Sequence, residues 1–525
     1  MTRRLSGPMA ALALLAAGCM IGPDFQRPPA KIAPNWSATN DAGLDINRVE
    51  YRDWWAVFND PVLTRLVAIA YRQNLGLLAA GVRVLEARAQ LGIAIGNLYP
   101  QQQQAGASIN YNRIPISVPY NLVNNTFWEA SFEAQSSWEI DLWGKLRRGI
   151  QSADDAYLAS VADYDDVLVT LTGDVASTYV QIRTLQQQIE IARENVVRQR
   201  AALQIAEIRF KGGASTQLDP DQATYVLGAT EAAIPELKIQ LAQSRDALSV
   251  LLGMPPGGLD PLLEGSSGIP NAPGRAAVGI PADLMRRRPD IRRAELEAAA
   301  QCAQIGFAKA DLLPTFSLLG TVGTVSTNVG KGGLGSVFTA GTLAYSAGPG
   351  LQWNIFNYGQ ITNNVRYQDA RFQELIVDYQ NAVLSAQQEV ENGIAQFLDS
   401  RREVQALKLS VAGALGAVQI ATIQYTEGTR DFTAVLTAEQ DLYSAQNNLA
   451  IASGGVPLGL IAIYRALGGG WQIREGSDFV PAATRDEMSN RTNWGTLLSP
   501  ELLQPRAPGL PGPRDTGPLI RAPEF

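Results

Sequence analysis

The chain has 525 residues, of which 46% are hydrophobic and 18% charged, and its formal net charge is −7 at pH 7. An acidic chain without a basic, aromatic-rich stretch gives no reason to expect nucleic-acid binding. It contains no histidine, so the commonest general base and metal ligand is missing. No nucleophile-elbow or phosphate-loop motif is found. We therefore expect no enzyme, no cofactor and no metal site.

The N-terminus predicts an exported lipoprotein. Two arginines precede a short apolar stretch, and small residues lead to Cys19, as in a secretory signal peptide. The six residues that end at Cys19, Leu-Leu-Ala-Ala-Gly-Cys, resemble a bacterial lipobox, which implies cleavage before Cys19 and attachment of lipid to it. Met20 follows instead of aspartate, which favours the outer membrane. Residues 1–18 are the expected signal peptide, and 19–60 an extended, lipidated segment.

Two regions carry strand signals. In 127–141 the even positions are mostly apolar and the odd positions from Glu129 onward are all polar. Such alternation is typical of a strand with two different faces. Weaker alternation precedes it, and a similar pair of segments follows in the second half of the chain. The sequence therefore predicts two hairpins, 105–141 and 315–356, with tips at 114–126 and 326–342.

The hairpins are candidates for membrane strands. No internal apolar run approaches roughly 18 residues, so we expect no membrane-spanning helix after the N-terminus. A closed β-barrel is the remaining way to cross, because lipid tolerates no unpaired sheet edge. Four strands cannot close alone, so copies of the chain would share the barrel. Phe132 and Trp138 should then face lipid. The residues expected to line the lumen are Glu129, Glu133, Glu139 and Asp141. The alternative is a soluble hairpin buried against helices.

A seven-residue repeat predicts coiled-coil helices. Apolar or aromatic residues recur at intervals of seven from Val175 to Phe210, and again from Val390 to Tyr425, each 215 residues later. A sustained seven-residue repeat winds neighbouring helices into a left-handed supercoil. We therefore expect helices from both halves of the chain to pack along one another.

The helices should be unusually long. The runs 145–210 and 360–427 lack proline, so each could form about 65 residues of helix, on the order of 100 Å at 1.5 Å per residue. Each run ends at a glycine-containing turn and is followed by a second helical stretch, 220–252 or 433–467. The two predicted coiled-coil hairpins are 145–252 and 360–467.

Sequence anchors recur in nearly one register between the halves. The segments 138–144 and 353–359 both begin with tryptophan and end with glycine, and further anchors match at the same spacing. Such self-similarity indicates an internal duplication. We expect a first repeat over 61–265, a second over 266–470, and a C-terminal tail rich in proline and glycine over 471–525.

Three stretches resemble one family. They are Cys-Met-Ile-Gly-Pro-Asp-Phe-Gln-Arg-Pro at 19–28, Arg-Arg-Arg-Pro-Asp-Ile-Arg-Arg-Ala-Glu at 286–295, and Tyr-Thr-Glu-Gly-Thr-Arg-Asp-Phe at 425–432. In combination they are similar to the outer membrane factor lipoproteins, TolC-type channels of the NodT subgroup. The resemblance covers roughly residues 19–470.

The resemblance implies an α+β membrane protein: a homotrimer with a shared twelve-stranded β-barrel, four strands per protomer, and a periplasmic coiled-coil tunnel. It implies docking onto a periplasmic adaptor protein and an inner-membrane transporter, with the chain as a passive efflux conduit. The transporter, and not the tunnel, would select the substrate. Two alternatives stay open: the outlet of a type I protein secretion system, and a lipid-anchored coiled-coil tether of the cell envelope.

The resemblance also implies a gate at the periplasmic end. In this family an aspartate of the first-repeat turn pairs with a tyrosine and an arginine of the second-repeat turn. The matching residues here are Asp219, Tyr425 and Arg430. The alternative is that Asp219 only caps the helix that follows it. The chain departs from the family at Ala434 and Thr437, where many members place carboxylates, so a second acidic ring is not predicted.

Overall fold

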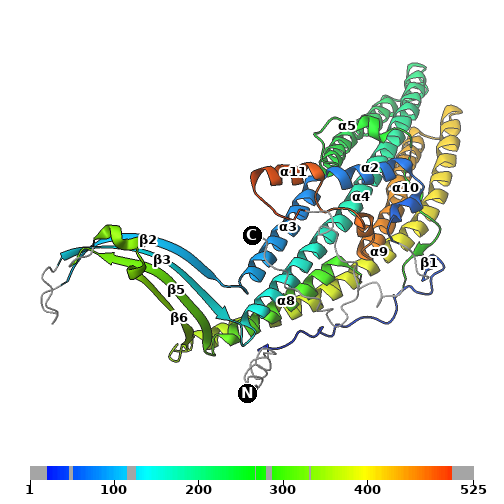
Figure 1. Ribbon diagram of the computed structural model, residues 1–525. Coiled ribbons are helices and arrows are strands. Elements are labelled where there is room, and N and C mark those ends of the chain that lie inside the picture. The colour runs from blue at the N-terminus through cyan, green and yellow to red at the C-terminus, as the bar shows by residue number, and fades with distance from the viewer. Residues whose placement is uncertain are drawn as a thin grey trace.

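The computed structural model describes residues 20–46, 51–114, 126–266, 268–279, 287–329 and 333–498. It combines a four-stranded sheet with a bundle of long helices, and the sheet extends from one end of the bundle (Figure 1). The signal peptide, Cys19 and both predicted hairpin tips in part lie outside the described residues.

The sheet contains β2 (Gln102–Arg113), β3 (Thr126–Ile140), β5 (Thr315–Thr327) and β6 (Leu343–Gln352). All neighbours are antiparallel, in the order β2-β3-β5-β6. The two predicted hairpins are present, and β3 pairs with β5 to join them into one sheet. The strands β2 and β6 are consequently its two edges.

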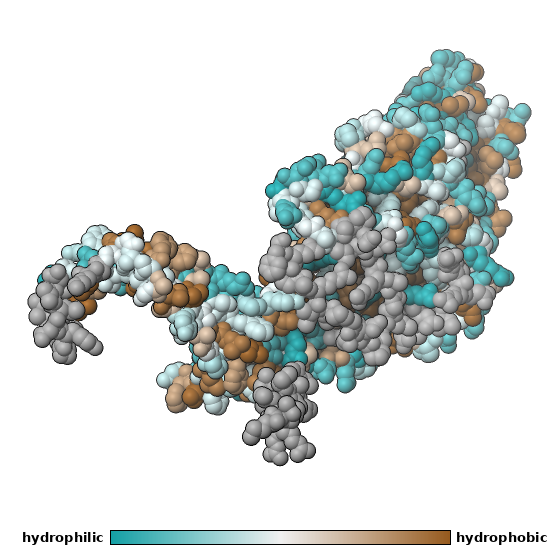
Figure 2. Space-filling model, in the orientation of Figure 1, coloured by the Kyte–Doolittle hydropathy of each residue, from teal (hydrophilic) through white to brown (hydrophobic). Residues whose placement is uncertain are grey.

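The register gives the sheet one apolar face. Tyr111 pairs with Trp128, their ring centroids 5.1 Å apart, and Val322 pairs with Tyr345. Because directly paired residues point to the same side, apolar side chains line up across all four strands. Figure 2 shows hydrophobic residues gathered on the sheet, whereas hydrophilic residues dominate the far ends of the helices. Large side chains of this face are exposed in the protomer, among them Trp128, Phe132, Trp138, Leu318, Val322, Tyr345 and Leu351.

The long helices agree with the sequence prediction to within a few residues. They are α4 (Lys145–Lys211), α5 (Leu218–Leu251), α9 (Gln360–Thr426) and α10 (Phe432–Ala466). Both α4 and α9 have 67 residues. The pairs α4–α5 and α9–α10 form antiparallel hairpins whose turns lie at the end far from the sheet (Figure 1).

Glycines set both ends of the two longest helices. Gly144 and Gly359 precede α4 and α9 with φ of 75° and 83°, and Gly213 and Gly428 follow them with φ of 71° and 75°. A positive φ strains residues that carry a Cβ atom, whereas glycine adopts it freely. The glycine anchors seen in the sequence thus mark equivalent turns.

The helical layer continues the sheet. The helix α3 (Leu75–Gly96) leads into β2, β3 leads into α4, α8 (Pro289–Ala310) leads into β5, and β6 leads into α9. Side by side, α3 packs on α4, α4 on α8, and α8 on α9. The helices therefore repeat the lateral order of the strands. Shorter elements among the described residues include β1 (Leu44–Asp45), α6 (Asp260–Leu263), β4 (Ala276–Ala277), η2 (Leu334–Phe338) and η3 (Ala340–Thr342).

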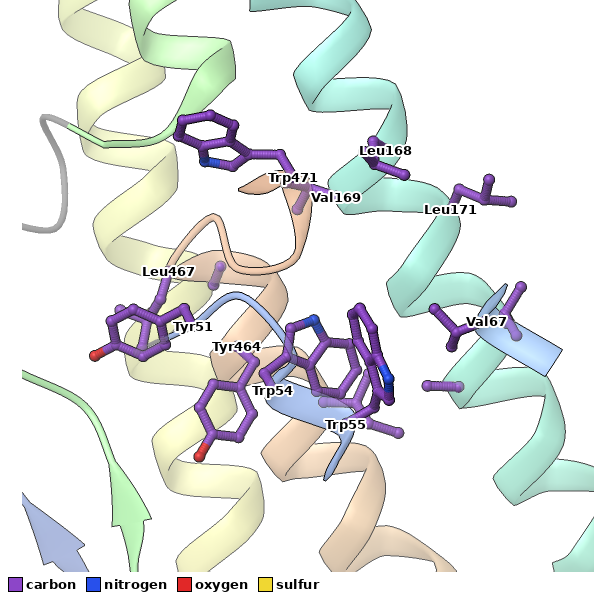
Figure 3. Packing of buried hydrophobic residues seen from close by; sticks show 14 of the residues in the cluster. Tyr51, Trp54, Trp55, Val67, Leu168, Val169, Leu171, Tyr464, Leu467 and Trp471 are labelled. Atoms are coloured by element: carbon purple, nitrogen blue, oxygen red, sulfur yellow. The ribbon is translucent and has the colours of Figure 1, made fainter. Parts of the chain in front are cut away.

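A second layer covers the middle of α4. It includes η1 (Trp54–Phe58) and α2 (Pro61–Gln73). Asp60 caps α2 by accepting from the N–H groups of Val62 and Leu63, and its other oxygen accepts from the hydroxyl of Tyr179 on α4. The ring of Trp54 stacks on Tyr464 of α10 at 5.6 Å (Figure 3). This layer ties both hairpins together.

Part of the predicted C-terminal tail belongs to this layer. The chain forms η4 (Trp471–Arg474) and α11 (Ala482–Arg491). Trp471, Phe479 and Val480 are buried in the main core. Residues 499–525, which hold most of the proline-rich sequence, lie outside the described residues.

The sequence analysis expected no helix apolar enough to span a membrane, but two helices pass this test by composition. Both α9 and α10 contain an 18-residue window long and apolar enough to cross a membrane by composition. The window in α10 is 56% buried within the protomer, as expected for a core helix, but the window in α9 is only 11% buried. The protomer thus exposes a long apolar surface on α9.

Candidate gate at the tips of the helical hairpins

The two hairpin tips meet in a small apolar cluster separate from the main core. It combines the ends of α4 and α5 from the first half with those of α9 and α10 from the second half. Its buried members are Ala202, Ala206, Ala223, Val226, Val418, Ala421, Tyr425, Phe432, Val435, Leu436, Ala438 and Leu442. Because most of these side chains are small, the contact between the tips buries little area per residue.

Asp219 and Tyr425, two of the three predicted gate residues, contact each other. The Tyr425 hydroxyl donates to Asp219 Oδ2 at 2.9 Å. Burial of the ring raises the pKa of Tyr425, and the hydrogen bond to Asp219 raises that pKa further. The helix α5 begins at Leu218, so Asp219 lies in its first turn and does not cap it. There it faces the positive end of the helix dipole.

The third predicted residue is not part of this contact. Arg430 is exposed, and no hydrogen bond or ion pair links it to another described residue. A different arginine occupies the position: the Arg209 guanidinium lies 4.8 Å from the centre of the Tyr425 ring and donates to the Thr426 carbonyl at 2.8 Å. Arg209 comes from the end of α4 and Asp219 from the start of α5, so both helices of the first hairpin contact Tyr425.

Sequence reasoning missed Arg209, because nothing local distinguishes it from other arginines of the heptad series. It immediately precedes Phe210, the last residue of the first heptad series. The equivalent position 215 residues later holds Gln424, so the two repeats differ at this point.

The positions Ala434 and Thr437 carry no carboxylate, and the Thr437 hydroxyl donates to the Thr433 carbonyl at 3.0 Å. In the described part of the chain, no group of three or more acidic or cysteine side chains could hold a metal ion.

Below the tips, polar residues connect α4 with α10. The Asn195 side chain donates to Gln446 at 2.7 Å, Arg198 donates to Gln446 at 3.2 Å, and Gln188 donates to Asn447 at 2.8 Å. We call these five residues the polar seam. Partly buried hydrogen bonds of this kind favour one alignment of the two helices, because a shift would leave polar groups unpaired.

Glu439 on α10 lies next to the seam with only 5% of its surface exposed. Burial raises its pKa to about 7, partly offset by the positive charge of Arg198. A carboxyl group that titrates near neutral pH within a helix contact makes that contact sensitive to pH.

The predicted lumen residues lie at the opposite end of the molecule. Glu129, Glu133 and Glu139 belong to β3 and point to the face opposite the apolar one. Asp141 was predicted to belong to the same strand, but β3 ends at residue 140. Its nearly buried carboxylate accepts from the backbone N–H and the side chain of Arg147. Asp141 therefore lies outside the strand and accepts hydrogen bonds from the first turn of α4.

The N-terminal segment runs along the second-half helices (Figure 1). Arg27 forms an ion pair with Glu295 of α8, and the backbone N–H of Ser37 donates to Glu391 of α9 at 2.8 Å. Near the start, the Ile21 N–H donates to the Trp143 carbonyl at 3.1 Å. These contacts fix the described chain immediately after Cys19.

The geometry defines a class: two helical hairpins that meet at one end and continue into a sheet with an apolar face at the other. The family model for outer membrane efflux proteins matches residues 66–254 and 280–469, and the chain belongs to this family of outer membrane channel proteins. It is therefore an outer-membrane component of an efflux system.

Individual relatives agree. The chain is 32% identical to the pyoverdine export outer membrane protein OpmQ of Pseudomonas putida over 85% of this chain and 94% of that protein. It is 30% identical to nodulation protein T of Rhizobium leguminosarum bv. trifolii over 84% and 92%. Its fold matches the solved outer-membrane channel OprN with a TM-score of 0.80 at 32% identity, covering 86% of this chain and 100% of that one.

Proposed function

We propose that the chain is the passive conduit of a tripartite efflux system. It carries substrates, delivered by an inner-membrane transporter and a periplasmic adaptor protein, through the periplasm and the outer membrane. One observation carries this proposal: a sheet with an apolar face continues into helices in the same lateral order. Among the described residues, the outermost strands and helices are covered on their inner side but leave their outer side open.

The sheet supports a shared barrel. Edge strands β2 and β6 leave backbone N–H and C=O groups unpaired, which lipid does not tolerate. Pairing β6 of one copy with β2 of the next, repeated over three copies, closes a barrel of twelve strands. The apolar face then meets lipid, and the face with Glu129, Glu133 and Glu139 meets the lumen.

The helices support the same homotrimer. On α9 the exposed fractions are 52% for Leu384, 78% for Leu409 and 58% for Ile420. On α3, at the other side of the layer, Ile93 is 66% exposed. Contact between neighbouring copies along these two sides of the layer would cover these side chains. The matching strand and helix orders of the two repeats also support internal duplication of the chain.

The tips supply the gate. Asp219 accepts from Tyr425 while Arg209 holds the Tyr425 ring, so the two hairpins of a protomer are tied at the end where the tunnel narrows. Hydrogen bonds to charged groups contribute about 1.5–3 kcal/mol each. Three copies of this tie keep the open state rare, and adaptor binding shifts the balance toward opening. Arg430 is exposed at the same tip, and in this proposal it takes part in closure by contacting a neighbouring protomer.

Lipid on Cys19 would add a second attachment to the outer membrane. The N-terminal segment leads from this residue along α8 and α9, which is compatible with an anchor at the membrane end of the helices. Acyl chains add about 0.8 kcal/mol per buried CH₂, but a barrel holds a protein in the membrane far more strongly. Cys19→Ser protein should therefore remain in the outer membrane.

Single-channel recording in planar bilayers tests the conduit and its gate together. The parent trimer should conduct weakly, and Asp219→Ala should conduct more strongly, because the shared acceptor is lost. The double variant Tyr425→Phe, Arg430→Ala should give a comparable rise. Preparations that stay trimeric yet form no channels would contradict the conduit. Channels whose conductance is the same in all variants would place the gate elsewhere.

Paired substitutions on β3 test the barrel separately. Phe132→Arg puts a charge on the proposed lipid face and should cost roughly 2–4 kcal/mol near the membrane midplane. Glu133→Gln lies next to it on the opposite face and should leave stability unchanged while reducing cation preference. Unfolding in lipid vesicles measures the first effect, and reversal potentials measure the second. Equal tolerance of both substitutions would contradict the proposed orientation.

A further inference from the structure

An apolar groove of about 350 Å³ lies where the helical layer meets the sheet. The turn that follows α8 contributes Leu312 and Leu313, and the first turns of α9 contribute Thr362 and Val365. Ile21 of the N-terminal segment forms a further part of the wall. The groove therefore lies within one protomer, on the side that carries the N-terminal segment.

Two cations flank the groove. Lys309 and Arg366 complete its lining. Arg366 donates to the neutral side chain of Asn363 at 3.1 Å, and neither cation forms an ion pair with another described residue. Long cationic side chains lay their methylenes along apolar surfaces and keep their charge in water or among headgroups. An apolar groove with such a rim fits a hydrocarbon chain that enters from a membrane surface.

The backbone beside the groove is fixed. Arg148 donates to the Ile21 carbonyl at 3.1 Å, and the Ile21 N–H donates to the Trp143 carbonyl. Gly22 meets Gly306 of α8 so closely that a Cβ atom on Gly22 would lie 2.4 Å from the Gly306 Cα atom. The wall at Ile21 therefore cannot swing away without breaking these contacts.

Cys19 stands only two residues before Ile21. An extended residue spans at most about 3.6 Å, so the backbone of Cys19 is within roughly 7 Å of Ile21 along the chain. We propose that one acyl chain attached to Cys19 lies in this groove, against Leu313 and Val365. This inference rests on the proposed lipidation of Cys19. The anchor would then bind the junction of α8 and α9 in addition to entering the bilayer.

A photoreactive fatty acid tests this placement. Cells that express the full chain are fed a diazirine-labelled fatty acid, membranes are irradiated, and the purified protein is digested and analysed by mass spectrometry. The expected product joins the lipidated Cys19 peptide to a peptide that contains 309–313 or 362–366. Crosslinks at these peptides that come only from free phospholipid would overturn the inference and assign the groove to a membrane lipid.

Filling the groove provides the matched control. Val365→Trp should reduce the crosslink from Cys19 roughly tenfold, since each displaced methylene changes the occupancy equilibrium about fourfold. Val377→Trp adds the same side chain at a position on α9 that is 53% exposed and outside the groove, and it should leave the yield unchanged. If Val365→Trp does not assemble, Thr362→Phe fills the groove from an exposed position.

Two outcomes separate this inference from its premise. If Cys19 carries the label but its crosslinks do not reach the groove, the acyl-chain site is wrong and lipidation stands. If Cys19 carries no label while phospholipids do, lipidation itself is wrong and the inference falls with it. An unchanged yield in Val365→Trp would also overturn the inference.

Discussion

The helices α4 and α9 have the same length and equivalent glycine turns, but they have different surroundings. In α4, 31 of 67 residues are buried, whereas in α9 only 11 of 67 are buried. The helix α4 lies between α3 and α8 and is covered by α2, η4 and α10. The helix α9 contacts α8 and α10 and leaves one long side open.

The difference shows that one heptad pattern can serve two environments. The same seven-residue spacing places Val175 of α4 and Val390 of α9 in the core, both with 0% exposed. Outside this shared stripe, α4 uses its apolar residues within the protomer, while α9 exposes Leu384 and Leu409. A helix that is apolar on a second side needs a second partner. We therefore read α4 as the folding centre of the protomer and α9 as its assembly surface.

The largest expected effect contrasts the ion pairs of the two helices. Arg474 of η4 forms an ion pair with Asp165 of α4, and their side chains are only 5% and 4% exposed. Arg402 of α9 forms an ion pair with Asp41, and these side chains are 64% and 26% exposed. Arg474→Met leaves a buried charge without its partner, which should cost about 3–5 kcal/mol. Arg402→Met should cost less than about 1 kcal/mol. Chemical denaturation in detergent, followed by circular dichroism, measures both. Equal losses would contradict the assignment of α4 as the folding centre.

Sequence reasoning succeeded for the elements because their signals are local. The heptad repeat and the glycines that flank it lie in the same stretch of sequence as the helix itself, so the bounds of α4 and α9 could be predicted closely. The pairing of β3 with β5 brings together segments from different halves, and its register depends on how α8 packs against α4. Burial of Phe479 also could not be read locally, because an irregular segment has no period that predicts a partner.

The candidate site was predicted only in part for the same reason. Family resemblance pointed to Asp219 and Tyr425, whose contact the structure contains. No role was predicted for Arg209 or Glu439, since a single arginine or glutamate in a heptad pattern resembles an ordinary solvated residue. Only the packing of two repeats against each other shows that Arg209 lies on a ring and that Glu439 is buried.

The second prediction concerns pH and the contact of α4 with α10. Burial raises the pKa of Glu439 from 4.5 to about 7, so the folded state resists ionisation. The neutral form favours folding fully below about pH 4.5, and this advantage is lost as pH rises through 7. Glu439→Gln stays neutral, so it should exceed the parent in stability by roughly 3 kcal/mol at pH 8 and by almost nothing at pH 4.

Thermal unfolding at both pH values measures this difference. Glu403→Gln removes a carboxylate from an exposed position on α9 and should leave the pH dependence unchanged. A parent and a Glu439→Gln variant whose melting temperatures differ equally at pH 4 and pH 8 would mean that folding does not raise the pKa of Glu439.

The third prediction tests α9 as the assembly surface. Leu384 is 52% exposed in the protomer, while Val169, at the equivalent position of α4, is 4% exposed. Leu384→Ala removes side-chain area that a neighbouring copy would cover, and should weaken assembly by about 2 kcal/mol per interface. Mass photometry in detergent should show more monomer. Val169→Ala should instead lower the stability of the protomer without changing the trimer fraction, and the reverse pattern would exchange the two roles.

The smallest expected effect lies at the tips, where the helices differ by one cation. Arg209→Gln gives α4 the residue that α9 carries at Gln424, and removes both the contact with the Tyr425 ring and the bond to the Thr426 carbonyl. A partly exposed cation–π contact is worth about 0.5–1 kcal/mol, so each protomer loses a tie weaker than the hydrogen bond of Asp219. Opening should become a few times more frequent in planar bilayers, with a smaller rise than in Asp219→Ala. Arg209→Lys keeps the charge but loses the planar donor group. Its opening frequency should lie between those of the parent and Arg209→Gln. If Arg209→Gln opens as rarely as the parent, the hydrogen bond between Asp219 and Tyr425 alone holds the tips. The difference between Arg209 on α4 and Gln424 on α9 would then have no effect on the gate.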